Sequence, residues 1–300
     1  MSANAPVPLH NPHSFIPKFF GPDPGLQQLL AARPQEFFLI RVEQMYPHLR
    51  GPVPAVRSAA HSALFLETGT ARMAVGYDHY TAQAGELLLV PAGQVYSFRP
   101  DDVNTGFLLH FHPELLRRGG AVAEPDFLTG WGNPLIRFAP EAAAFIQVLL
   151  GRMLTLYQAG GPQALEQVLP HLFTLLAEAA LAYQPFAVVA PSASVTLAQA
   201  FKQLLSQRVR HTHQVAAYAN LLHVTPNHLS KAVRVATGKS PGRWIDEALV
   251  LEAKSLLFQT TLPVAEVAAL VGVPDASYFS RLFRKVEGRP PSAVRRPAAS

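Results

Sequence analysis

Short apolar runs alternate with turn residues through much of the first half of the chain. Six such runs, each four to seven residues long, lie between positions 37 and 111, with Gly, Pro or Asp residues between them. Runs of this length with regular turn signals are typical of an antiparallel sandwich or barrel. We therefore expect strands at Phe37–Val42, His61–Glu67, Ala71–Tyr77, Glu86–Val90, Tyr96–Arg99 and Gly106–Phe111. The preceding residues 1–35 carry seven prolines and predict an irregular arm with a short helix near Leu26–Ala32.

After Pro140 the apolar residues recur at helical spacing instead. The segment 141–158 carries a stripe of Phe145, Leu149, Met153 and Leu156, and the segment 163–183 carries Leu165, Leu169, Leu172, Leu176 and Ala180. The sequence Gly160-Gly161-Pro162 between them predicts a tight turn. The two stripes therefore predict a pair of helices that either closes the barrel or joins two subunits.

Beyond this pair the pattern predicts a separate helical domain. Residues 185–194 have no helical period and are bounded by prolines, so they are the candidate linker. The following segment reads as helix almost throughout, which is typical of an all-α unit. The expected architecture is thus α+β with two domains: a barrel with its helical pair at 1–184, and an all-α domain at 195–300.

Charge and composition sharpen this division. Residues 1–191 carry 11 Lys/Arg against 14 Asp/Glu, whereas residues 192–300 carry 14 Lys/Arg against 6 Asp/Glu. A basic C-terminal part indicates a polyanionic partner such as nucleic acid, although an ordinary solubilising surface is the alternative. The chain has no cysteine, which excludes disulfides, cysteine-based zinc sites and thiol nucleophiles. We see no signal peptide and no membrane-spanning run, so we expect a cytoplasmic protein without a membrane partner.

Two helix-turn-helix patterns lie about 50 residues apart in the basic part. The first joins a short helix at Gln214–Leu222 to a helix at Asn227–Thr237, which Thr225 caps and Gly238 ends. The second joins Pro263–Val271 to a helix that Asp275 caps and Gly288 ends. Between them, Ser240 caps an 18-residue helix at Pro241–Phe258, about 27 Å long. Successive major-groove faces are about 34 Å apart, so such a rod could hold two recognition helices in adjacent grooves.

These residues resemble the AraC family of bacterial transcription regulators. The resemblance covers about a third of the chain and rests on the segments Asn227–Lys231, Thr237–Pro241, Glu252–Leu257, Asp275–Lys285 and Gly288–Ser292. It implies that the N-terminal part of each second helix reads bases, through Asn227, Ser230 and Lys231 in the first unit and Ala276, Ser277, Ser280 and Arg281 in the second. Phosphate contacts are expected from Arg284, Lys285, Arg289, Arg295 and Arg296.

The first half of the chain also fits this family, whose members often carry a cupin-like barrel that senses an effector. Many cupins bind a metal through two His and a Glu in one motif and a His after a Pro-x-Gly turn. Here His61 and Glu67 are present, but Ala63 and Tyr96 occupy the other two positions. We therefore expect no metal and no cofactor, and instead a pocket for a small organic effector lined in part by His61, Glu67 and Tyr96. A filled structural core is the alternative.

Two further motifs carry less weight. His110 and His112 would share one face of a strand, but neither an acidic partner nor a third histidine lies nearby in the sequence, so a simple surface or core pair is the competing interpretation. Residues Gly238–Gly242 match the G-x-S-x-G pattern of hydrolases. That pattern needs a strand before the serine, whereas here a helix precedes it, so Ser240 is interpreted as a helix cap.

We interpret the chain as a sequence-specific DNA-binding transcription regulator controlled by a small molecule. The expected partners are double-stranded DNA, a second copy of the chain in a homodimer, and RNA polymerase if the protein is an activator. A cupin enzyme with an accessory helical domain would need metal ligands that the sequence lacks. An alkylation-repair protein would need a methyl-accepting cysteine. A nucleoid-type binder would show no sequence preference, whereas specific binders typically reach ratios of about 10³–10⁷.

Overall fold

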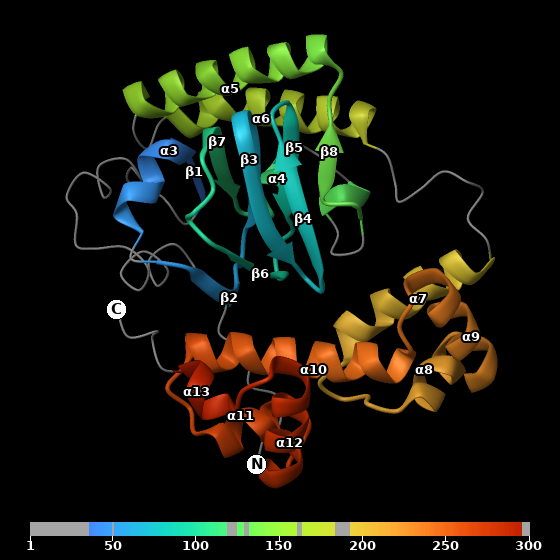
Figure 1. Ribbon diagram of the computed structural model, residues 1–300. Helices are drawn as coiled ribbons and strands as arrows, with labels where there is room; N and C mark the ends of the chain where they lie inside the picture. The colour runs from blue at the N-terminus through green and yellow to red at the C-terminus, as the bar shows by residue number, and fades with distance from the viewer. Residues whose placement is uncertain are drawn as a thin grey trace. The chain divides into compact units, whose positions relative to one another are not determined.

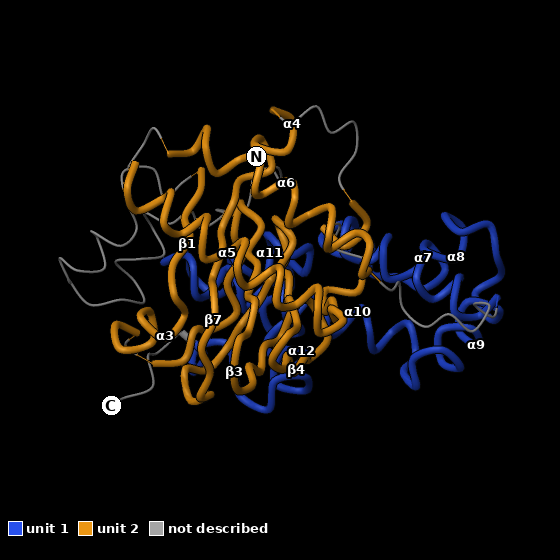
Figure 2. Tube along the Cα trace, turned by 90° about the horizontal axis from the view of Figure 1, so that it is seen from above, with its two compact units in different colours: residues 1–8, 187–300 blue, residues 9–186 orange. Residues whose placement is uncertain are grey.

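The computed structural model describes residues 36–49, 51–118, 125–128, 132–160, 164–183 and 193–295. The chain divides into two compact units, residues 9–186 and residues 187–300 with 1–8 (Figure 2). The division after Phe186 falls within the expected linker at 185–194, and helix α7 (Ala193–Arg208) begins two residues before the expected start of the helical domain at 195. The expected arm at 1–35 and most of the linker lie outside the described residues.

The first unit, residues 9–186, is built on two antiparallel sheets that share one long strand (Figure 1). Its strands are β1 (Phe37–Arg41), β2 (Val53–Arg57), β3 (His61–Val75), β4 (Asp78–Gln83), β5 (Glu86–Val90), β6 (Val95–Phe98), β7 (Asn104–Phe111) and β8 (Leu135–Arg137). One sheet has the order β1-β7-β3-β5-β8. In the other, the C-terminal part of β3 pairs with β4 and β6, and β6 also pairs with β2. The expected sheet-rich fold is thus confirmed.

Strand β3 replaces two shorter strands that the pattern predicts at His61–Glu67 and Ala71–Tyr77. The pairing with β7 shifts register between Leu66 and Thr68, so the chain passes through a bulge instead of a turn. Gly69 has a φ of 77°, and a Cβ there would overlap the carbonyl of Val103. Glycine alone tolerates this close approach of the opposite strand. The strands β2, β4 and β8 were not expected, because prolines or polar residues interrupt their apolar pattern.

Helices α5 (Pro140–Gly160) and α6 (Ala164–Ala182) pack on one face of the first sheet (Figure 1). The strands contribute Phe37, Phe65, Phe107 and Leu109 to this core. Shorter helices complete the unit: α3 (Val42–Met45), η1 (Tyr46–His48), α4 (Glu114–Arg118) and η2 (Asp126–Leu128). The opposite face of the sheet lines the inside of the barrel with a second apolar cluster that includes Ile40, Leu64, Leu66 and Leu88.

The apolar stripe of α5 is rotated from the expected one. Phe145 is 46% exposed, and the buried residues are Ile146, Leu149, Leu150, Met153 and Tyr157. On α6, Leu165, Leu169, Leu172 and Leu176 are buried as expected, but Ala179 replaces Ala180. These inward stripes belong to the core of one chain. Among the described residues, α5 is long and apolar enough to cross a membrane by length and composition alone, but its buried face packs against the barrel.

In the described part of the second unit every regular element is a helix. After α7 come α8 (Val215–Leu221), α9 (Pro226–Thr237), α10 (Pro241–Gln259), α11 (Val264–Leu270), α12 (Ala276–Glu287) and α13 (Pro291–Arg295). The expected caps are present: the side chains of Thr225, Ser240 and Asp275 each accept hydrogen bonds from backbone N–H groups in the first turn. Gly238 and Gly288 end α9 and α12 with φ values of 73° and 77°. Local sequence therefore determines where these helices begin and end.

Candidate nucleic-acid interface and ligand-binding barrel

The pairs α8–α9 and α11–α12 are two copies of the same arrangement. In each, the second residue after the first helix has a left-handed backbone, His223 with a φ of 55° and Gly272 with a φ of 80°. In each, the next N–H donates to a carbonyl of the first helix, from Val224 to Ala219 and from Val273 to Ala268. Both turns therefore use one backbone geometry, which sets the second helix at a defined angle to the first.

Burial of one face of each second helix leaves the opposite face for a partner. Helix α9 buries Leu229, Ala232 and Val233, and helix α12 buries Phe279, Leu282 and Phe283. The rings of Phe279 and Phe283 lie 5.7 Å apart. The exposed positions on both helices are mostly polar or basic, with Val235 as an apolar exception at 68% exposure.

The candidate base-reading residues fall into two groups. Asn227 and Lys231 on α9, and Ser277 and Arg281 on α12, are exposed. Ser230, Ala276 and Ser280 are only partly exposed, because they lie at the edge of the buried face. Sequence reasoning missed the exposed residues His228, Arg234 and Tyr278. Arg234 lies seven positions after Asn227, a spacing that places both on one helix face, and Tyr278 is 50% exposed.

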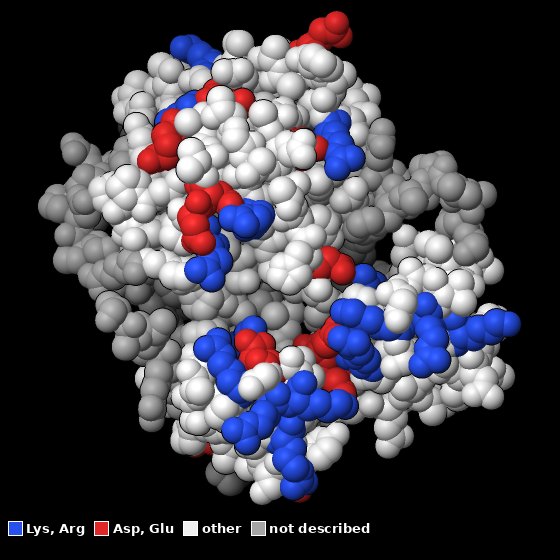
Figure 3. Space-filling view, viewed as in Figure 1, with Lys and Arg blue, Asp and Glu red and all other residues white. Residues whose placement is uncertain are grey.

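The candidate phosphate-binding residues differ in their ion pairs. Lys285 Nζ lies 3.1 Å from Asp246 Oδ2, and Arg289 lies 3.8 Å from Glu287. Arg281 and Arg284 form no ion pair with the residues that the structure describes. The side chain of Arg295 and all of Arg296 lie outside the described part. Lys and Arg side chains gather over α12 and over the region of α7 and α9 (Figure 3), which gives the helical unit a basic surface.

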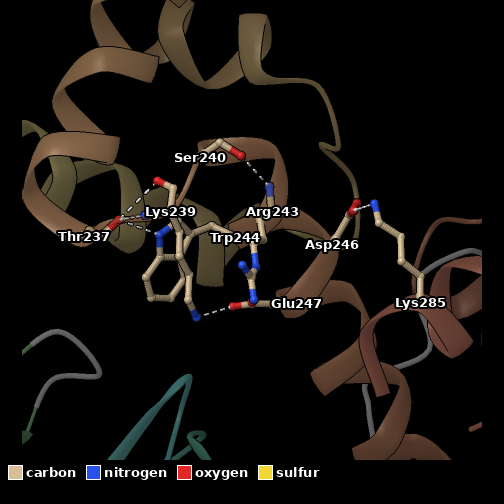
Figure 4. A network of polar contacts seen from close by, with 8 residues as sticks. All are labelled: Thr237, Lys239, Ser240, Arg243, Trp244, Asp246, Glu247 and Lys285. Carbon is tan, nitrogen blue, oxygen red and sulfur yellow. Dashed lines mark hydrogen bonds and ion pairs between the residues drawn. The ribbon is translucent and has the colours of Figure 1, made fainter. Parts of the chain in front are cut away.

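Helix α10 links the two helix-turn-helix pairs through a polar network (Figure 4). At its start, Trp244 Nε1 donates to Thr237 Oγ1 at 2.9 Å, so the helix is tied to the end of α9. The ammonium groups of Lys202 and Lys239 lie 4.3 and 4.8 Å from the centre of the Trp244 ring. Further along, Asp246 pairs with Lys285 of α12. The 19-residue helix, about 28 Å long, therefore contacts both recognition helices.

A second link joins the loop after α7 to the second turn. Arg210 donates to Glu252 of α10 at 2.7 and 3.0 Å, and the Glu252 carboxylate is buried. A Cβ at Gly272 would overlap the carbonyl oxygen of Arg210 and lie 2.8 Å from the His213 ring. The turn of the second pair thus packs directly on the loop that precedes the first pair.

In the barrel, the three residues expected to line a pocket do not share one face. His61 pairs across the strands with Phe111, its ring lies 5.1 Å from that of Phe111, and Phe111 belongs to the core beneath the helices. The Nδ1 atom of His61 accepts a hydrogen bond from the backbone N–H of Ala92 at 3.0 Å. Glu67 forms an ion pair with Arg41. Tyr96 alone lies on the inward face, opposite Val75 and in line with Phe98.

His110 lies on the inward face, where His61 and Glu67 were expected instead. It is 6% exposed, its Nδ1 lies 3.0 Å from Ser62 Oγ, and its ring stacks on Phe38 at 4.8 Å. His112 lies beyond the end of β7 and accepts from the N–H of Glu114, so it does not continue a histidine face. The described residues contain no group of three or more His, Asp or Glu side chains that could hold a metal ion.

Burial of His110 and His61 makes the barrel sensitive to acid. Burial lowers the pKa of His110 to about 3 and that of His61 to about 4, with a further contribution from neighbouring histidines. In the unfolded chain a histidine titrates near 6.5, so below that pH the unfolded state binds more protons and stability falls. We expect a loss approaching about 1.4 kcal/mol per pH unit for each histidine between pH 6 and 5.

Amide hydrogen exchange of β3 and β7 in the full chain gives the free energy of opening at each pH. The change of this free energy with pH measures the expected loss of stability. The variant His110→Phe should remove about half of it, whereas the change His79→Gln on an exposed position of β4 should leave it unchanged. An opening free energy that is flat between pH 6 and 5 would contradict the assignment of neutral, buried imidazoles.

Each of the two units contains a segment that matches a known domain family. A family described as an AraC-like ligand binding domain matches residues 60–173, and a helix-turn-helix domain family matches residues 218–297. The arabinose operon regulatory protein of Salmonella typhimurium is 35% identical over 94 residues, which are 31% of this chain and 34% of that protein. The MmsAB operon regulatory protein of Pseudomonas aeruginosa is 37% identical over 82 residues, 27% of this chain and 26% of that protein.

Among solved structures, the C-terminal domain of AraT, a response regulator from Geobacillus stearothermophilus, is 27% identical. The match has a TM-score of 0.33 and covers 35% of this chain and 87% of that one. The present chain spans about a third or less of the length of these two curated relatives. The two family matches cover most of the barrel unit and most of the helical unit in the expected order. The chain therefore belongs to the AraC family of transcription regulators, with an AraC-like ligand-binding domain followed by a helix-turn-helix domain.

Proposed function

We propose that this protein binds specific DNA sequences through α9 and α12 and regulates transcription in response to a small molecule in its barrel. The observation that carries the proposal is the pair of capped helices that bury one face and present Asn227, Lys231 and Arg281 on the other. Amide, ammonium and guanidinium groups at the start of a recognition helix can read purine edges in the major groove.

Selection of bound sequences from random DNA by the full chain tests this function. A specific regulator enriches one motif with two half-sites about one helical turn apart, because α10 holds both recognition helices. It also binds that motif about 10³-fold or more tightly than unrelated DNA at the same salt concentration. Binding without an enriched motif would support the nucleoid-type alternative and contradict the proposal.

The outer face of α5 is the proposed contact between two copies of the chain. Phe145 is 46% and Val148 71% exposed, one helical turn apart. Burial of two such side chains in a dimer is favourable by about 25 cal/mol per Å² of apolar surface. We expect the wild type to be a dimer in light scattering, and the double change of Phe145 and Val148 to Asp to give a folded monomer.

The same double change at Leu169 and Leu176 provides the contrast. Both residues are buried in the core of one chain, so aspartate there should unfold the barrel and not simply separate two copies. The change Gln158→Asp, on an exposed position of α5, controls for added charge. A monomeric wild type, or a dimer that survives the change at Phe145 and Val148, would refute this interface.

The remaining partners follow from the proposed role. The family's members are regulators, so we propose that the protein is not an enzyme and acts in the cytoplasm, where its DNA lies. RNA polymerase would be a partner if the protein is an activator. A metal-dependent cupin activity is not proposed, because Ala63 and Tyr96 stand at two ligand positions of the motif and His61 faces the helices.

A further inference from the structure

The inward face of the barrel is largely apolar, and its described polar side chains away from the strand ends are His110, Ser62 and tyrosines. The partly buried side chains there are Phe38, Tyr46, Leu49, Met73, Tyr80, Phe98, Leu108 and Leu135, and they pack on the buried cluster of Ile40, Leu64 and Leu66. In the described strands, charged residues reach this face only at strand ends, at Asp78 and at the ion pair of Glu86 with Arg137. Side chains that face inward yet keep partial exposure indicate that the described residues do not fill this space completely.

His110 is one of the few polar side chains on this face. Its register opposite Phe38 and Ser62 sets it on the inward face, beside Leu108 two positions away. Ser62 Oγ engages Nδ1 at 3.0 Å, and Phe38 stacks on the ring with an angle of 10° between the planes. The other nitrogen, Nε2, is buried and has no hydrogen-bond partner among the residues that the structure describes. A buried polar atom without a partner costs about 1–3 kcal/mol, which a bound ligand would offset.

We propose that the inside of the barrel binds an uncharged organic molecule with a largely apolar body and one hydroxyl or carbonyl group, and that this group bonds to His110 Nε2. This inference rests on the proposed function, because it gives the chemical class of the effector. His110, not His61 or Glu67, is then the residue that orients the ligand.

The surroundings of His110 select against two other ligand classes. An anionic ligand would find no free countercharge among the described residues, because His110 is neutral, Arg41 is turned toward Glu67 and the Phe107 ring, and Arg137 is paired with Glu86. A sugar would bury several hydroxyls, whereas among the described residues this face offers, away from the strand ends, only His110, Ser62 and the tyrosine hydroxyls as partners. A hydroxyl can either donate to or accept from Nε2, so it suits either tautomer of the ring.

A matched series of small probes tests the class with the full chain. Toluene, benzyl alcohol, benzaldehyde and benzoate share one ring and differ in the attached group, and glucose represents the sugars. We expect benzyl alcohol or benzaldehyde, at millimolar concentration, to raise the melting temperature and to shift the ¹⁵N resonance of His110 Nε2. Toluene should stabilise the protein less and leave that resonance in place. Benzoate and glucose should do neither.

The variant His110→Phe keeps a stacking ring and removes the nitrogen. It should bind benzyl alcohol about threefold to tenfold more weakly and bind toluene with unchanged affinity. The variant His112→Phe is the control and should behave as the wild type. If the His110 variant fails to fold, the nitrogen resonance of the wild type still decides the matter.

Three outcomes would overturn the inference. The first is that benzoate or glucose binds best, and the second is that none of the probes shifts the His110 resonance. The third is that the variant His110→Phe retains the preference for benzyl alcohol over toluene. Each leaves the selected DNA motif unaffected, so failure here is distinguishable from failure of the proposed DNA-binding function.

Discussion

The change Gly272→Ala is expected to destabilise the helical unit by about 2–5 kcal/mol. A left-handed backbone costs an alanine about 1–2 kcal/mol. The new Cβ would also overlap the carbonyl of Arg210, and relieving such overpacking typically costs about 1–3 kcal/mol more. Urea unfolding followed by the fluorescence of Trp244, in a Trp131→Phe background that leaves it the sole tryptophan, measures the loss.

Gly288→Ala supplies the matched control. Gly288 has almost the same φ, 77° against 80°, but nothing lies within 4 Å of its added Cβ. Its substitution should therefore cost about 1–2 kcal/mol, from the backbone conformation alone. The difference between the two variants isolates the contact between the loop after α7 and the second turn. Equal losses would show that this contact does not constrain the turn.

DNA recognition should depend most on Arg281. The change Arg281→Ala is expected to weaken binding to the selected motif by about 1–3 kcal/mol, or about 5- to 150-fold, and to relax the preference at one base pair. Its guanidinium is exposed at the second turn of α12 and forms no ion pair with the described residues, so it is available to a base. Competition binding against all single-base variants of the motif measures both effects.

Lys285→Ala is the contrasting variant. A phosphate contact carries no sequence information, so its loss should weaken all sequences alike and lower the salt slope by about one. Because Asp246 lies 3.1 Å from the ammonium group, removing that carboxylate with Asp246→Asn should strengthen binding to every sequence. If Arg281→Ala changes neither affinity nor preference, α12 is not a recognition helix.

Much of the helical unit can be predicted from the sequence because its determinants are local. Thr225, Ser240 and Asp275 cap their helices within one turn, and Gly238 and Gly288 end theirs through a left-handed backbone. Each interaction spans only a few residues, so contiguous sequence encodes it. The exposed face of α9 was partly predictable for the same reason, since the spacing of Asn227, Lys231 and Arg234 follows from helical geometry.

The barrel shows where local pattern is insufficient. A single bulge near Gly69 reverses which residues of β3 face inward, so Ser62 and Leu64 share the inside with Met73 and Val75. His61 accordingly faces the helices, and His110 takes the inward position through its pairing with Ser62. The exposure of Phe145 has the same origin, because which side of an apolar stripe is buried depends on distant partners. Sequence alone therefore predicts the helices, their ends and the DNA-binding unit, whereas long-range strand pairing and packing decide which side chains face the ligand and which face the core.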